Sequence, residues 1–217
     1  MAVARRAIRV EDKAARHAAI LDAAARLLRA EPARVANVAD VARAAGVAKG
    51  TVYLYFPGKE DLLLALHERN VEHFFDALCT RLATLEPLAV DAVLAVVRAN
   101  VVDDALFLPL AARCLGVMQQ AIEPGQVAVF RLRMAKRLER AGAGLERQFA
   151  MPVGEGVTLL RRSFALIVGL WQLAPVAARG AAMRGEADTL RFTFATEVDA
   201  ALATLWRGAL TPTSRRG

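Results

Sequence analysis

The sequence predicts an all-α protein with about nine helices in two domains. Runs of β-branched residues are short, and the 217 residues are dominated by Ala, Leu, Arg and Glu, which favour helices. Apolar residues recur at intervals of three and four, the spacing that places them on one side of a helix. Glycine and proline mark the breaks between these periodic segments.

The first two helices are expected over residues 12–30 and from Asn37 onward. The first ends at "AEPARVAN", where a proline interrupts the pattern. Asn37 is a good N-cap for the second helix, and Asp40 lies three residues later, where a carboxylate can complete the cap. Gly46 follows directly and favours the left-handed conformation that ends a helix and turns the chain.

The third helix is expected over residues 48–56, where a Pro-Gly pair ends it. A long fourth helix follows over residues 58–82, with Glu60 and Asp61 in its first turn, where the helix dipole favours negative charge. A disordered tail is expected from about residue 211. Five further helices are expected over residues 88–102, 104–121, 124–149, 153–178 and 186–208.

Helices two and three, joined by a tight turn, have the pattern of a helix-turn-helix. At about 100° per residue, Val52 and Phe56 fall on one side of the third helix and can pack on the first two helices. The opposite side carries Gly50, Thr51, Leu54 and Tyr55. The sequence therefore predicts a short helix with one buried face and one face directed toward DNA.

The distribution of charge agrees with contact to a polyanion near the N-terminus. Residues 1–60 hold 11 Lys and Arg against 6 Asp and Glu, and residues 61–217 hold 18 against 16, which together give the net charge of +7. The excess of positive charge is thus concentrated in the first quarter of the chain, where it favours nucleic acid.

Individual side chains on the third helix have chemistry that suits a duplex. Lys49 lies at the N-terminal end, where base edges are usually reached, and Gly50 either permits close approach of the backbone or is a poor helix residue in a loop. Thr51 and the two tyrosine hydroxyls can donate to phosphate oxygens. Tyr53 is expected to be part-buried at the edge of the core face, and Tyr55 to be better placed for contact, although both can be ordinary packing residues.

Two further groups of positive charge can bind phosphate. Lys59 lies just before the fourth helix, so its ammonium and the free N–H groups of that helix can hold one phosphate together, or it is a solvated lysine. Arg5, Arg6 and Arg9 form either an arm that reaches the minor groove or a disordered tail.

Residues 14–66, about a quarter of the chain, resemble the N-terminal DNA-binding region of the TetR family of bacterial transcriptional repressors. The resemblance is carried by "AILDAAARLL" and by the pattern G-V-x-K-G-T-x-Y-x-Y-F-P-x-K-E-x-L. This sequence departs from the family pattern in two places. Ala48 stands where the family usually has serine or threonine, and Asn37 stands where it usually has threonine. The roles in DNA contact that the resemblance implies fall on Asn37, Lys49, Gly50, Thr51, Tyr53, Tyr55 and Lys59.

The resemblance also implies the organisation of the whole chain. Residues 1–60 would form the arm and DNA-binding domain, and residues 61–217 an effector-binding and dimerisation domain, with the fourth helix bridging the two. In such homodimers the last two long helices of each subunit form a four-helix bundle. Their two recognition helices lie one turn of DNA apart and bind a palindromic operator. Trp171 and Trp206 would lie either in that interface or in the core of one subunit.

A small-molecule effector is implied as well, bound in a cavity between helices four to eight so that it shifts the fourth helix. An apolar lining favours a lipophilic effector, with Arg113 and Gln172 as candidate polar partners. The same apolar side chains can instead be ordinary core residues. The candidate lining residues are Phe107, Leu110, Met118, Phe130, Met134, Phe164 and Trp171.

Other classes of function have less support. Cys79 and Cys114 form no CxxC, and His17, His67 and His73 lie on charged helical stretches as expected surface residues, so no metal site and no cofactor is predicted. No nucleophile motif or phosphate-binding loop favours an enzyme, although an all-α enzyme or ligand-binding protein without a DNA-binding role is the alternative. No signal peptide or membrane span is expected, which predicts a cytoplasmic protein.

Overall fold

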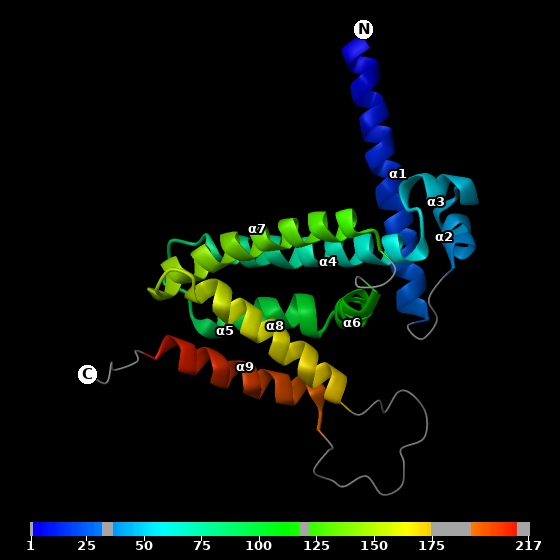
Figure 1. Ribbon diagram of the computed structural model, residues 1–217. Helices are drawn as coiled ribbons and strands as arrows, with labels where there is room; N and C mark the ends of the chain where they lie inside the picture. Colours follow the sequence, from blue (N-terminus) through cyan, green and yellow to red (C-terminus); the bar gives the residue numbers. More distant parts are fainter. Residues whose placement is uncertain (1, 32–36, 118–121, 175–191, 212–217) are drawn as a thin grey trace, which may run out of the picture. The chain divides into compact units, whose positions relative to one another are not determined.

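The computed structural model describes residues 2–31, 37–117, 122–174 and 192–211, and for residues 2–11 and 115–117 it describes the backbone alone. Throughout these ranges every regular element is a helix, which confirms the predicted fold class (Figure 1). The helices are α1 (Ala2–Ala30), α2 (Val38–Ala45), α3 (Lys49–Tyr55), α4 (Lys59–Leu82), α5 (Val90–Val97), the π-helical η1 (Arg98–Val102), α6 (Phe107–Val117), α7 (Pro124–Phe149), α8 (Glu155–Leu173) and α9 (Phe194–Leu210).

The chain divides into two compact units by packing. The first contains the described residues of Met1–Val71 and Ala105–Ala128, and the second those of Glu72–Asp104 and Val129–Gly217. Helices α4 and α7 therefore contribute residues to both units. The predicted boundary between residues 60 and 61 divides the chain by function, so this division by packing does not test it.

The first unit has one apolar core shared by its helices. Ile20 of α1, Val41 of α2 and Val52 of α3 are completely buried in it, and Leu66 of α4 is buried with them. Arg69 of α4 ties that helix to α1, because its Nη1 lies 2.6 Å from Oδ1 of Asp22. The short helices α2 and α3 are held in place by this core rather than by their own length.

Helix α1 begins at Ala2, ten residues before the predicted start at residue 12. The segment "AVARRAIRVEDKAAR" lacks glycine and proline and is rich in helix-forming residues, so nothing in it ends the helix. The arginines at positions 5, 6 and 9 therefore lie on a helical backbone rather than in a disordered tail, and their contact with a minor groove stays a prediction.

The core of the second unit contains Trp206, which is completely buried within one chain. Its Nε1 donates to Oγ of Ser163 at 3.0 Å, and Ser163 in turn donates to the carbonyl oxygen of Leu159 at 2.8 Å. The first of these bonds joins α9 to α8, which lie side by side in Figure 1, and the second lies within α8. Trp206 is thus a core residue of the subunit, whereas Trp171 is only half-buried.

Two glycines bring the backbones of α7 and α8 into direct contact. A Cβ atom at Gly156 would lie 2.3 Å from the carbonyl oxygen of Gly142, and a Cβ at Gly142 would lie 2.8 Å from the backbone nitrogen of Val157. Glu146 supports the same crossing, because its Oε1 accepts from the N–H groups of Gly154 at 2.8 Å and Gly156 at 3.2 Å. The start of α8 is therefore capped by a carboxylate from α7.

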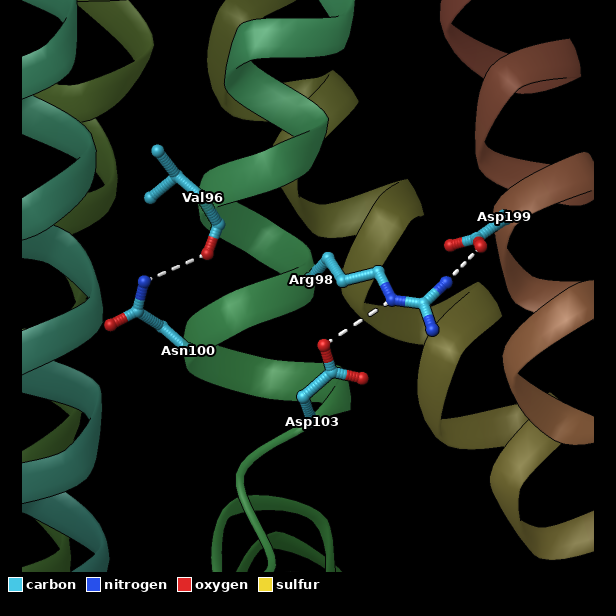
Figure 2. A network of polar contacts seen from close by, with 5 residues as sticks. All are labelled: Val96, Arg98, Asn100, Asp103 and Asp199. Carbon is cyan, nitrogen blue, oxygen red and sulfur yellow. Dashed lines mark hydrogen bonds and ion pairs between the residues drawn. The ribbon is translucent and has the colours of Figure 1, made fainter.

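A π-helical turn follows α5, where the sequence predicts one continuous helix over residues 88–102. Figure 2 shows Arg98, at the start of this turn, reaching two carboxylates. Its Nε lies 3.3 Å from Oδ2 of Asp103 at the end of the turn, and its Nη1 forms an ion pair with Asp199 of α9. Asn100 donates to the carbonyl oxygen of Val96 at 2.9 Å, which occupies a backbone acceptor next to the π-turn.

The other predicted helix boundaries differ little from the observed ones. Helix α7 has the predicted bounds, and α6 and α8 begin three and two residues later than predicted. Helix α9 begins at Phe194 rather than at 186, although residues 186–191 lie outside the described part of the chain. The tail after residue 211 lies outside it too.

The prediction that all three histidines lie on the surface was wrong for His67. Its side chain is 4% exposed, and its ring centroid lies 5.5 Å from that of Phe107 in an edge-on arrangement. Burial lowers the pKa of His67 to about 4. His17 is half-buried against Phe56, while His73 is exposed as predicted.

The buried His67 predicts a loss of stability in mild acid. Because its pKa is lower in the folded state than its usual 6.5, its stabilising effect is complete above pH 6.5 and is lost as the pH falls toward 4. The loss should amount to about 3 kcal/mol of the free energy of unfolding. In urea unfolding curves between pH 7 and 4, His67→Gln should flatten the pH dependence relative to the wild type.

The matched control is His73→Gln, an exposed position on the same helix. It should leave the wild-type pH dependence unchanged, since it removes no buried group and leaves His67 and every carboxylate in place. An equal pH dependence in the wild type and His67→Gln would contradict the assignment.

Candidate nucleic-acid interface

The turn between α2 and α3 is built by local signals at both ends of α2. Oδ1 of Asn37 accepts from the N–H of Asp40 at 2.8 Å, which caps the helix as predicted. At the other end Gly46 has φ +68°, and the N–H groups of Gly46 and Val47 donate back into the last turn of α2 at 3.2 and 3.0 Å. The chain therefore reverses sharply into α3, next to α2 in Figure 1.

Helix α3 has a buried face and an outer face, as the sequence predicts. Val52 and Phe56 are buried in the core of the first unit. Ala48 offers no side-chain hydrogen bond to the first turn, so the departure from the usual N-cap leaves that end uncapped. Packing of Val52 and Phe56 therefore sets the orientation of the outer face.

The outer face is open around Gly50. Lys49 and Gly50 are both exposed, and a Cβ atom at Gly50 would have nothing within 4 Å. Thr51 is half-buried beside them, and Leu54, one helical turn after Gly50, is 83% exposed. A rigid surface such as a base-pair edge can thus approach the backbone of α3 closely here.

Of the two tyrosines, Tyr53 is the more exposed, whereas the sequence predicts that Tyr55 is the better placed for contact with DNA. Tyr53 is 45% exposed, with Nζ of Lys49 5.9 Å from its ring centroid, whereas Tyr55 is half-buried and packs against the core. Both lie about 80° from the buried Val52–Phe56 face, on either side of it. Helix α1 covers the side of α3 that carries Tyr55, and the ring centroid of His17 lies 6.2 Å from that of Tyr55. This cover comes from tertiary packing, which the sequence of α3 does not reveal.

Lys59 is the first residue of α4 and is half-buried. Glu60 and Asp61 follow it in the first turn, as predicted, so the positive end of this helix already has carboxylates near it. Asn37 is exposed at the start of α2. The predicted DNA-contacting residues thus all belong to α2, α3, their flanks and the start of α4.

The predicted effector-lining residues are distributed over both units. Phe107 and Leu110 are buried in the first unit, and Phe130 is buried in the second. Met134 and Trp171 are half-buried and Phe164 is exposed, all in the second unit, while Met118 lies outside the described residues. Their grouping in one cavity remains a prediction.

Sequence reasoning assigned no role to Leu54, although it placed this residue on the outer face of α3. Leu54 is identified by its exposure, as a large apolar side chain one helical turn from an open glycine. The sequence alone does not show how exposed a side chain is. Among the helical residues whose side chains the structure describes, Leu54 is the most exposed large apolar one.

The described residues contain no group of three or more His, Cys, Asp or Glu arranged to hold a metal ion. None of their helices has both the length and the apolar character that crossing a membrane requires.

Comparisons with protein-family models cover most of the chain. Residues 20–66 match the model of bacterial regulatory proteins of the tetR family. Residues 68–213 match the model of the tetracyclin repressor-like C-terminal domain. Except for residue 67 in α4, the two matches together include α2 to α9, and the first contains the complete helix-turn-helix.

Individual relatives match over shorter stretches. The chain is 33% identical over 69 residues to the fatty acid metabolism regulator protein of Bacillus subtilis, and 43% identical over 65 residues to the HTH-type transcriptional regulator EthR of Mycobacterium tuberculosis. These matches cover 32% and 30% of this chain and 36% and 30% of the two relatives, so each spans about a third of the relative's length.

A solved structure from Mesorhizobium loti, assigned to the TetR family of transcriptional regulators, has a similar fold. It superposes with a TM-score of 0.56 at 18% identity, covering 90% of this chain and 96% of the other. At this identity the likeness concerns the fold alone.

Proposed function

Because the chain belongs to the TetR family and is a DNA-binding transcriptional regulator, we propose that it is a repressor that binds a palindromic operator as a homodimer and is released by a small lipophilic effector. The observation that carries the proposal is the outer face of α3, where Lys49, the open Gly50 and Tyr53 are exposed opposite the buried Val52. This face leaves room for a base-pair edge at Gly50, and Lys49 and Tyr53 supply a cation and a hydroxyl beside it.

The proposed contacts divide into two kinds. Lys49, Gly50 and Thr51 would meet the major groove, and the hydroxyl of Tyr53 and the ammonium of Lys59 would bind phosphates. Asn37 would lie near a phosphate at the start of α2. Tyr55 contributes less than Tyr53 in this proposal, because its ring packs against the core.

The homodimer is supported by the uncovered surface of α8 and α9. Leu173 is 72% exposed, Phe164 is exposed as well, and Gly169 and Gly208 have nothing within 4 Å of an added Cβ. On α9 the exposed side also carries the small residues Ala200 and Thr204. A second copy can approach such a surface closely and bury its apolar side chains.

Control by a lipophilic effector is supported by the apolar character of the candidate lining residues and by the match of residues 68–213 to a repressor-like domain. The relative named for fatty acid metabolism matches under a third of this chain, so it does not select the effector. Family membership favours regulation over catalysis, and the absence of a catalytic role is part of the proposal.

The test begins with DNA selected by the full-length protein from a random library and with the DNA upstream of its own gene. A symmetric site should be recovered, and its affinity should fall steeply with salt because phosphate contacts release counterions. Lys59→Ala should reduce the slope of log affinity against log salt by about one for each half-site. The control Lys136→Ala, an exposed lysine on α7, should leave the slope unchanged.

Selection of no preferred DNA sequence would overturn the proposal of an operator. An affinity that does not fall with salt would overturn the proposed phosphate contacts. For the effector, a panel of lipophilic compounds should include one that releases the operator, typically by a coupling of about 1 to 3 kcal/mol.

A further inference from the structure

Leu54 is an apolar side chain that the described part of its own subunit leaves largely uncovered. It is 83% exposed, and it lies on the side of α3 opposite the buried Val52 and Phe56. Single exposed leucines are common and need no explanation by themselves. This one differs because it lies four residues after Gly50, on the one face of α3 that is open to close approach.

The polar side chains of α3 indicate which surface Leu54 would meet. Lys49, Thr51 and Tyr53 can all donate hydrogen bonds, so they suit phosphate oxygens and the acceptor atoms of base edges. Leu54 can neither donate nor accept. In the major groove, the apolar group that a base pair presents is the C5-methyl of thymine, and it is the only surface there that gains from contact with a leucine.

Building on the proposed function, we propose that Leu54 packs on the C5-methyl group of a thymine in each half-site, and so acts as a specificity-determining residue. Because α3 can approach the groove closely at Gly50, a side chain one turn later on the same face reaches the base edges rather than the backbone. The operator should then contain a thymine in each half-site whose methyl group contributes to binding.

The experiment removes the methyl group without changing the hydrogen bonds of the base. In the operator selected by the full-length protein, each thymine is replaced in turn by deoxyuridine, and binding is measured at one salt concentration. For the wild type, one position in each half-site should weaken binding about four-fold, and replacement in both half-sites about fifteen-fold, as expected for loss of one buried methyl contact per half-site.

Two variants show which residue senses the methyl group. Leu54→Ala should bind the thymine operator more weakly and should lose no further affinity on the deoxyuridine operator. The substitution is at an exposed helical position, where alanine supports the fold. The matched control Leu132→Ala changes a leucine that is 59% exposed on α7, and it should keep the wild-type ratio of the two affinities.

The outcomes separate this inference from the proposed function. Tight binding to a selected operator with no sensitivity to deoxyuridine would overturn the role of Leu54 and leave the regulator intact. An equal sensitivity in the wild type and Leu54→Ala would assign the methyl contact to another residue and would overturn it too. Selection of no operator would overturn the proposed function and this inference together.

Discussion

Gly156→Ala should lower the free energy of unfolding by about 3 kcal/mol, because the new methyl group meets backbone atoms. Its Cβ would lie 2.3 Å from the carbonyl oxygen and 2.9 Å from the Cα of Gly142. Backbone atoms cannot rotate away as a side chain can, so α7 and α8 must separate. In thermal unfolding followed by circular dichroism, the midpoint should fall by about 6 to 12 °C.

The matched control is Gly50→Ala, since both glycines are the second residue of their helices. A Cβ at Gly50 meets nothing within 4 Å, so alanine there should stabilise the protein by about 1 kcal/mol through helix propensity. Gly142→Ala should destabilise as Gly156→Ala does, and the double variant should lose less than the sum, because the helices are already apart. Equal stabilities of Gly156→Ala and Gly50→Ala would show that the two backbones are not in contact.

Gly50→Leu should weaken operator binding by about a hundredfold or more while the fold is retained. The leucine side chain would occupy the space through which a base edge reaches the backbone of α3. Loss of even one good base contact in each half-site corresponds to roughly 2 to 6 kcal/mol. The measurement is the affinity for the selected operator by fluorescence anisotropy, with the unfolding midpoint as a check on folding.

Gly125→Leu is the control for this substitution. Gly125 is an exposed glycine and the second residue of α7, so the chemical change and the position within a helix are the same. It should leave operator binding at the wild-type value. Undiminished binding by Gly50→Leu would place the duplex elsewhere on the molecule.

The sequence predicted those features that depend on neighbouring residues. The helix-turn-helix follows from the cap at Asn37, the left-handed Gly46 and the spacing of Val52 and Phe56, and all of these act within a few residues. The bounds of α7 are equally local, set by Pro124 at the start and a break after Phe149. The fold class was predictable for the same reason.

Features that depend on distant contacts were not predictable in this way. His67 was expected on the surface because charged residues surround it in sequence, yet it is buried beside Phe107, forty positions away. The positions of Tyr53 and Tyr55 on α3 are symmetrical about the buried face, and only the cover provided by α1 separates them. The π-helical turn that begins at Arg98 produces no distinct spacing of apolar residues, so the sequence pattern did not separate it from α5. The exposure of Leu54 depends on how the helices pack, which the spacing of apolar residues does not predict.

The uncapped start of α3 has a consequence for how the proposed repressor would respond. Ala48 has no side-chain acceptor, so the first turn of α3 lacks a cap that is typically worth about 1 kcal/mol. In the proposed complex DNA would have to hold this turn in place, and part of that cost would weaken operator binding. A more weakly bound operator is released by a smaller coupling free energy, so an effector with weak coupling would suffice to release the DNA.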